Sequence, residues 1–247
     1  GSLKIEETRA VPGISAKLNT IAKIRGEYVV ASKYDFWFLN ADLSPKFHAA
    51  MDPWFSANVL DLVGITALDK DAYVLMGSNK SLLRVRQNPE ADDVQGWPNF
   101  TAGRSHIEAV GGLGRARIDT ERAKFSYIHS SATDGRYVFM ATVPDNKNKK
   151  QFVISKALMK DWMLSGEFVP TAEMLKKDRS LGELYVTGMV YEDGKLYAVS
   201  KNWNVLVVID VAQEAVVEAW GLPEELTDIR GLVKDGSTFE VIDANRV

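Results

Sequence analysis

A short pattern of strand, turn and strand recurs along the chain and constrains its fold more than any other feature. Each copy has a small residue within an apolar strand, then a charged or Gly-containing turn, then an aromatic or apolar strand. The copies begin at Val63, Ile128, Val186 and Ile229, with a weaker copy at Leu18. The first and last intervals, Leu18 to Val63 and Val186 to Ile229, each span roughly 45 residues, which indicates one repetitive architecture.

The copies that begin near Phe125 and Leu184 each contain four strand-like segments with alternating apolar residues. Turns such as Asp-Gly between these segments favour antiparallel hairpins. Because a four-stranded sheet cannot shield both of its faces alone, stacking sheets around an axis buries each face against a neighbour. The sequence therefore predicts an all-β fold, a single β-propeller of four-stranded antiparallel blades over residues 1–247. We expect five blades, or six if Thr101 to Lys124 forms strands of its own.

Small residues recur at one aligned position of the first strand in each copy. They are Gly64, Ser130, Gly188 and Gly231. The innermost strands of a propeller crowd the axis, so a position with little room for a side chain is expected there. The alternative is that these are ordinary strand glycines. We expect the aligned residues to gather about a common axis.

Two segments interrupt the strand pattern and are predicted to be insertions between blades, Thr101 to Lys124 and Thr171 to Glu183. At the N-terminus, Leu3 to Val11 is expected to pair with the C-terminal strands and close the ring, since both ends would otherwise leave unpaired strand edges. Residues 1 and 2, Gly-Ser, resemble a tag remnant. A signal peptide or membrane anchor upstream is compatible with this start, and a periplasmic or secreted location is favoured.

Composition excludes several partners and sites. The net charge of −3 and the pI near 5.7 give no reason to expect nucleic acid or an anionic membrane as a partner. No apolar run is long enough to span a membrane. The chain has no cysteine, and its three histidines are far apart in the sequence, so neither a metal site nor a cofactor is predicted. We expect a monomer.

The segment from Lys195 to Trp220 resembles the repeat of the YVTN family of β-propellers. An apolar-aromatic strand, Leu196 to Val199, is followed by a polar Asn-bearing turn. A second strand, Val207 to Asp210, then reads Val-Val-Ile-Asp. The resemblance covers one blade well and the others in outline. It implies the propeller fold and says little about function, because propellers carry many different activities.

The residue just before each aligned small residue is a candidate binding residue at the mouth of the central channel. These residues are Asn19, Val63, His129, Thr187 and Arg230. The set is mostly polar, and Arg230 could offer a fixed fork of donors to an anionic group. We predict a small polar or anionic ligand at Asn19, His129, Thr187 and Arg230. The alternative is that Arg230 pairs with Asp228 and that His129 is a satisfied histidine.

Trp203 is a second type of candidate, because it lies in the polar turn Ser-Lys-Asn-Trp-Asn-Val. A tryptophan in a loop can stack on a sugar or anchor a protein partner. Residues of this kind also cap the packing between blades. A protein or a glycan is therefore an alternative partner to the small ligand.

Catalysis is not indicated by the residues at the aligned positions. None of them is an acid, and only Asp61 and Asp228 lie just upstream, in the loops that lead to inner strands. Glycosidases of the common type need two facing carboxylates, and no catalytic residue is predicted here. We favour a non-catalytic binding module. The alternative is a propeller hydrolase, of glycosidase or lactonase type, with its site in the central funnel.

Overall fold

The computed structural model describes residues 1–33, 35–50, 61–67, 72–79, 81–87, 105–112, 127–144, 151–160, 164–172, 184–200 and 202–247. All regular elements in these ranges are β-strands, and the strands within each sheet pair in antiparallel fashion. The same ranges include no helix with the length and apolar character to cross a lipid bilayer.

The strands form five sheets, each ordered as a simple meander. The first contains β1 (Thr20–Ile24), β2 (Glu27–Ala31), β3 (Asp35–Leu39) and β4 (Pro45–Ala50). The second contains β5 (Leu62–Ala67), β6 (Ala72–Gly77), β7 (Ser81–Gln87) and β8 (Ser105–Gly112). The third contains β9 (Ile128–Thr133), β10 (Tyr137–Thr142), β11 (Ile154–Leu158) and β12 (Leu164–Phe168). The fourth contains β13 (Val186–Glu192), β14 (Lys195–Ser200), β15 (Val205–Asp210) and β16 (Ala215–Gly221), and the fifth contains β17 (Arg230–Asp235) and β18 (Thr238–Ile242).

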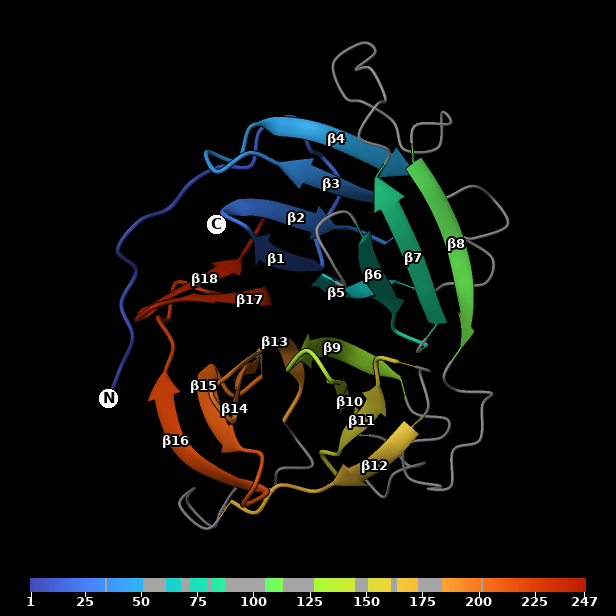
Figure 1. Cartoon of the computed structure of the whole chain (residues 1–247). Helices are drawn as coiled ribbons and strands as arrows, with labels where there is room; N and C mark the ends of the chain where they lie inside the picture. Colours follow the sequence, from blue (N-terminus) through green and yellow to red (C-terminus); the bar gives the residue numbers. More distant parts are fainter. Residues whose placement is uncertain are drawn as a thin grey trace.

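The sheets lie around a common centre, with the first strand of each sheet innermost (Figure 1). Among these inner strands, β1 contacts β5 and β17, β9 contacts β5 and β13, and β13 contacts β17. This arrangement is that of a β-propeller, so the predicted all-β propeller of four-stranded antiparallel sheets is confirmed. The blade count stays a prediction, since parts of the connections between sheets lie outside the described residues.

The local sequence explains why each pair of strands turns where it does. Between β13 and β14, Asp193 and Gly194 both have positive φ, 48° and 82°, and the flanking Glu192 and Lys195 pair directly. Two central residues with positive φ match the right-handed twist of the adjoining strands, and Asp-Gly is a preferred pair for such a turn. The hairpin signal in the sequence therefore corresponds to a tight two-residue turn.

The apolar core lies between successive sheets, as stacking predicts. Phe139 and Ile154 of the third sheet pack with Leu196 and Val207 of the fourth. Similar clusters join the first sheet to the fifth, the second to the third and the fourth to the fifth. Each sheet thus depends on its neighbours for burial, which is the physical reason for the circular arrangement.

The aligned small residues lie where inner strands approach most closely. A Cβ atom added to Gly188 would lie 2.4 Å from the carbonyl carbon of Gly231, and one added to Gly231 would lie 2.6 Å from the backbone nitrogen of Ile21. At Gly64 the nearest atom is the Oγ of Ser131 on β9. The three glycines therefore mark contacts between β5 and β9, β13 and β17, and β17 and β1.

One predicted insertion needs correction. Residues 105–112, placed within the insertion from Thr101 to Lys124, form β8 and pair with β7 as the fourth strand of the second sheet. Their sequence, Ser-His-Ile-Glu-Ala-Val-Gly-Gly, begins with two polar residues and ends with two glycines, so only its short middle part reads as a strand. The remainder of that segment lies outside the described residues. So does 173–183 of the second insertion, whose first residue, Thr171, bridges to Ala215.

The two chain ends are joined by backbone hydrogen bonds. Arg9 and Val247 exchange two, at 2.7 and 2.8 Å, and Leu3 donates to the carbonyl of Gly221 at 2.8 Å. The N-terminal segment thus contacts the last residue of the chain and also the outer strand β16. Closure of the ring by these pairings stays a prediction, together with the blade count.

Asn245 fastens the C-terminal end to the segment before β1. Its Oδ1 accepts from the backbone nitrogen of Leu18 at 3.0 Å, and its Nδ2 donates to the carbonyl of Ala16 at 2.6 Å. We expect Asn245→Ala to lower the free energy of unfolding by about 2 kcal/mol, because it leaves a buried N–H without a partner and puts alanine at a positive φ of 56°. Denaturant unfolding measures this loss. Asn245→Asp, which keeps the acceptor, should lose less, and equal losses in both variants would contradict the assignment.

Candidate functional site

One pocket opens where the inner strands begin. Its volume is 350 Å³, and its lining residues in the described part of the chain are Asn19, Asp61, Val63, Ser78, Tyr127, His129, Val143 and Arg230. They come from the first, second, third and fifth sheets. The pocket is thus assembled from four of the sheets, and no single blade could form it.

β-bulges lie at the candidate positions of three inner strands. In β5, β9 and β13 the pairing with the second strand skips one residue, and the skipped residues are Val63, His129 and Thr187. A bulged residue makes no ladder pair, so the strand can turn its side chain away from the regular pleat. The repeat that aligns these residues in the sequence therefore corresponds to a shared backbone irregularity.

Three of the predicted ligand-binding residues, Asn19, His129 and Arg230, line the pocket, and Val63 lies beside them. Asn19 and His129 are half-buried. Ligand binding by these residues stays a prediction. The structure brings them together in space although they are more than 200 residues apart at the extremes of the sequence.

Thr187 is not part of the lining. Its side chain is 3% exposed, and its Oγ1 donates to the carbonyl oxygen of Ile229 at 2.6 Å. The hydroxyl therefore holds β13 against the segment that leads to β17. This bond uses the donor that a ligand would need.

Trp203 also lies away from the pocket lining. It is half-buried and packs against the core cluster between the third and fourth sheets. This is the packing role that the sequence left open as the alternative to a stacking platform. Trp37 is likewise buried and stacks on His48 at 4.9 Å.

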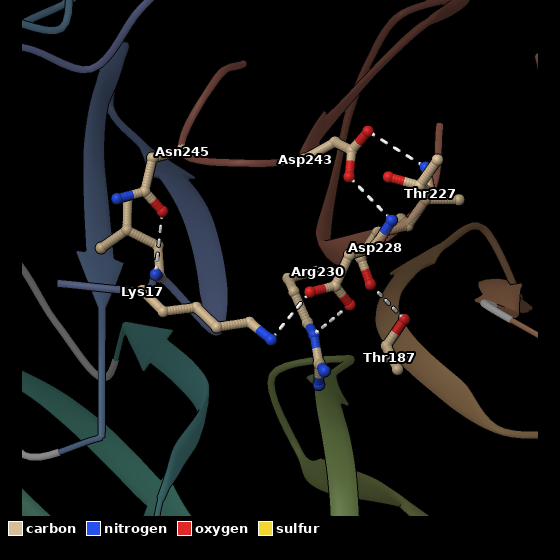
Figure 2. A network of polar contacts seen from close by, with 9 residues as sticks. Lys17, Thr187, Thr227, Asp228, Arg230, Asp243 and Asn245 are labelled. Carbon is tan, nitrogen blue, oxygen red and sulfur yellow. Dashed lines mark hydrogen bonds and ion pairs between the residues drawn. The ribbon is translucent and has the colours of Figure 1, made fainter. Parts of the chain in front are cut away.

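Arg230 is oriented by an ion-pair network (Figure 2). Its Nε donates to Asp228 Oδ1 at 3.1 Å, and Lys17 Nζ lies 2.8 Å from Asp228 Oδ2. Asp228 is itself fixed, because its backbone nitrogen donates to Asp243 Oδ1 at 2.8 Å. The two terminal nitrogens of Arg230 point away from Asp228, and within the described ranges they make no hydrogen bond. The pairing with Asp228 therefore positions the guanidinium and leaves its outer edge available.

Four lining residues were not among the sequence candidates: Asp61, Ser78, Tyr127 and Val143. Asp61 and Tyr127 each stand three positions before an aligned small residue. Ser78 and Val143 directly follow the second strands β6 and β10. Extending the repeat alignment by two residues, and to the end of the second strand, would have found all four.

The third position before each small residue, with the corresponding Lys17 two positions before Asn19 in the weaker copy, gives a set that we name the outer ring: Lys17, Asp61, Tyr127, Tyr185 and Asp228. Lys17 and Asp228 belong to the Arg230 network. Tyr185 lies 6.2 Å from His129 between ring centres, and its hydroxyl donates to the carbonyl of Pro144 at 3.3 Å. Tyr127 and Tyr185 are 47% and 37% exposed. The outer ring thus has charged residues at the first, second and fifth sheets and tyrosines at the third and fourth, and two of its members, Asp61 and Tyr127, line the pocket.

The residues that the structure describes include no group of three or more His, Cys, Asp or Glu side chains arranged to hold a metal ion. Among the described lining residues, Asp61 is the one carboxylate and Arg230 the one permanent cation. A pair of facing carboxylates is therefore not found in this part of the lining. The chemistry available is that of hydrogen bonding, one negative and one positive charge, and one imidazole.

Comparison with known proteins identifies the fold. No protein-family model and no curated protein matches the chain, so the YVTN resemblance stays a prediction. The structure of Myxococcus xanthus glutaminyl cyclase is similar, with a TM-score of 0.62 at 10% identity over 97% of this chain and 97% of that chain. The WD40 β-propeller domain of Doa1 is similar with a TM-score of 0.53 at 8% identity over 96% of this chain and 64% of that chain. At such low identity these likenesses show the propeller fold alone.

Proposed function

We propose that the chain is a non-catalytic propeller module whose pocket binds a small ligand through an anionic group, with Arg230 as the recognising residue. The orientation of Arg230 carries this proposal. Asp228 occupies its Nε, while the terminal nitrogens have no partner among the described residues. A guanidinium fixed in this way offers two parallel donors to a carboxylate or phosphate without a further loss of side-chain freedom.

The size of the pocket favours a small molecule over a protein or glycan partner. Pockets for small molecules range from about 300 to 1,000 Å³, and this one, at 350 Å³, lies near the lower end. Val63 and Val143 add apolar wall to the polar set. A ligand with one anionic group and a compact apolar body would satisfy both parts of the lining.

Ligand-observed NMR with a matched pair of compounds tests the proposal. Phenylacetate carries a carboxylate, and phenylacetamide has the same body without the charge. We expect phenylacetate to bind the wild-type protein more tightly. Arg230→Gln should weaken its binding by about tenfold to a hundredfold, because a charged hydrogen-bond pair is lost, while the binding of phenylacetamide should change little.

Arg136→Gln is the control variant, because Arg136 is exposed in the turn between β9 and β10 and is not a lining residue. It removes the same charge from the molecule and should leave phenylacetate binding unchanged. Equal binding of the two compounds to the wild-type protein, or unchanged phenylacetate binding by Arg230→Gln, would contradict the proposal.

A second candidate is an enzyme, and one observation favours it: the pocket contains an imidazole and a carboxylate, His129 and Asp61. The glutaminyl cyclase with a similar fold supplies a reaction to test. Incubation with a peptide that begins with glutamine, followed by mass spectrometry for loss of ammonia, tests this candidate. The hydrolase alternative has less support, because glycosidic cleavage of the common type needs a second carboxylate.

A further inference from the structure

Asp61 is the one carboxylate among the described lining residues, and the proposed function gives it no role. It is half-buried and stands directly before β5, with a positive φ of 26°. Its backbone carbonyl accepts from the nitrogen of Ser78 at 2.9 Å, which fixes the residue at the pocket. Within the described ranges its carboxylate makes no hydrogen bond or ion pair. A negative charge therefore stands at this pocket without a counter-charge from these residues.

Asp61 and Arg230 line the same pocket and are not paired with each other. The ion pair of Arg230 is instead made with Asp228, so the two opposite charges of the lining remain separate. A ligand that carries only an anion would satisfy Arg230 and would leave Asp61, a lining residue of the same pocket, without a counter-charge. A ligand that also carries a cationic group can satisfy both charges of the lining.

We propose that the pocket selects a zwitterion, an α-amino acid with an apolar or aromatic side chain. Its carboxylate lies at Arg230, its ammonium group lies at Asp61, and its side chain lies against the apolar and aromatic lining of Val63, Tyr127 and Val143. The proposal rests on the proposed function, since it keeps the anion at Arg230. The volume of 350 Å³ is sufficient for a molecule of this size.

Calorimetric titration with phenylalanine and two derivatives tests the inference. N-acetylphenylalanine lacks the ammonium group, and phenylalaninamide lacks the carboxylate. We expect phenylalanine to bind the wild-type protein about tenfold more tightly than either derivative, because each derivative leaves one charge of the pocket unpaired. Leucine with its N-acetyl derivative extends the series to an aliphatic side chain.

Two variants separate the two charges. In Asp61→Asn the affinities of phenylalanine and N-acetylphenylalanine should become similar, while the preference for a carboxylate over an amide remains. In Arg230→Gln the affinities of phenylalanine and phenylalaninamide should become similar, while the preference for a free ammonium group over the N-acetyl group remains. Asparagine tolerates a positive φ well, so the Asp61→Asn protein should fold, and thermal unfolding checks this. Glu224→Gln, an exposed acid away from the pocket lining, is the matched control.

Three results would overturn the inference. The first is that neither phenylalanine nor leucine binds more tightly than its N-acetyl derivative. The second is that Asp61→Asn binds phenylalanine in preference to N-acetylphenylalanine as strongly as the wild-type protein does. The third is that Glu224→Gln loses this preference as much as Asp61→Asn does. If phenylacetate still binds through Arg230 in these cases, the proposed function stands and only the inference of a zwitterionic ligand fails. If phenylacetate binding is also independent of Arg230, both proposals fail.

Discussion

Gly188→Ala is expected to destabilise the protein by about 3 kcal/mol, at the upper end of the cost of overpacking a core. The new Cβ would lie 2.4 Å from the carbonyl carbon of Gly231, 2.5 Å from its oxygen and 2.8 Å from the nitrogen of Leu232. All three are backbone atoms of an inner strand, which cannot move aside as a flexible side chain can. To admit the methyl group, β13 and β17 would have to separate along the central contact. Denaturant unfolding of the variant measures the loss.

Gly221→Ala is the matched control, because Gly221 is also a strand glycine but lies at the end of the outer strand β16. A Cβ there would meet Ser2 Oγ at 3.5 Å, an ordinary contact. We expect a change within about 0.5 kcal/mol, as for most surface substitutions. If Gly188→Ala unfolds at the same denaturant concentration as the Gly221→Ala protein, this result would contradict the close contact between β13 and β17 at Gly188.

Tyr28→Ala is expected to cost about 3 to 5 kcal/mol, the usual range for removal of a large buried ring. Tyr28 is 2% exposed within the core between the first and fifth sheets. The guanidinium carbon of Arg9 and the Nζ of Lys23 lie 5.6 and 5.3 Å from its ring centre. Arg9 also donates to the Tyr28 hydroxyl at 3.0 Å. One side chain therefore joins the N-terminal segment to β1 and β2. Equilibrium unfolding measures the loss, and a loss below about 1 kcal/mol would contradict this role.

Tyr28→Phe keeps the ring and removes the hydroxyl, so it separates packing from titration. Burial, and next the contact with Glu240, raise the pKa of Tyr28 above its ordinary value of 10.0. A raised pKa in the folded state gives stability that is present below pH 10.0 and is lost as the pH rises through the folded-state pKa. Above pH 10.0 the wild-type protein should lose stability faster than Tyr28→Phe. Parallel stability curves for the two proteins in this range would contradict the shift.

The sequence was a good guide to the fold because the constraint is local and repeated. Alternating apolar residues and Asp-Gly turns determine each hairpin, and the requirement to bury both faces of a sheet then dictates stacking. β8 was missed because its sequence starts with two polar residues, Ser105 and His106, and ends with two glycines, which leaves only a short middle part with strand character. Its Gly111 and Gly112 read as a flexible insertion.

The candidate site was predicted less completely. Alignment of the repeats found Asn19, His129 and Arg230, because these positions depend only on the backbone that the copies share. The same alignment selected Thr187, whose hydroxyl is bonded to Ile229 across a sheet boundary. Such a bond depends on the distance between two blades, which no pattern within a blade encodes. For Arg230 the proposed pairing with Asp228 was an alternative to binding, but the two are compatible, since the ion pair uses one edge of the guanidinium.

The skipped residue of β9 makes the pocket suitable for engineering. His129 takes no part in the pairing of its strand and is only half-buried, whereas Val63, the skipped residue of β5, is buried in the core between the second and third sheets and has to stay apolar. A library randomised at His129 should therefore yield proteins that fold alike and differ in what they accept. New specificities could then be selected from one stable framework.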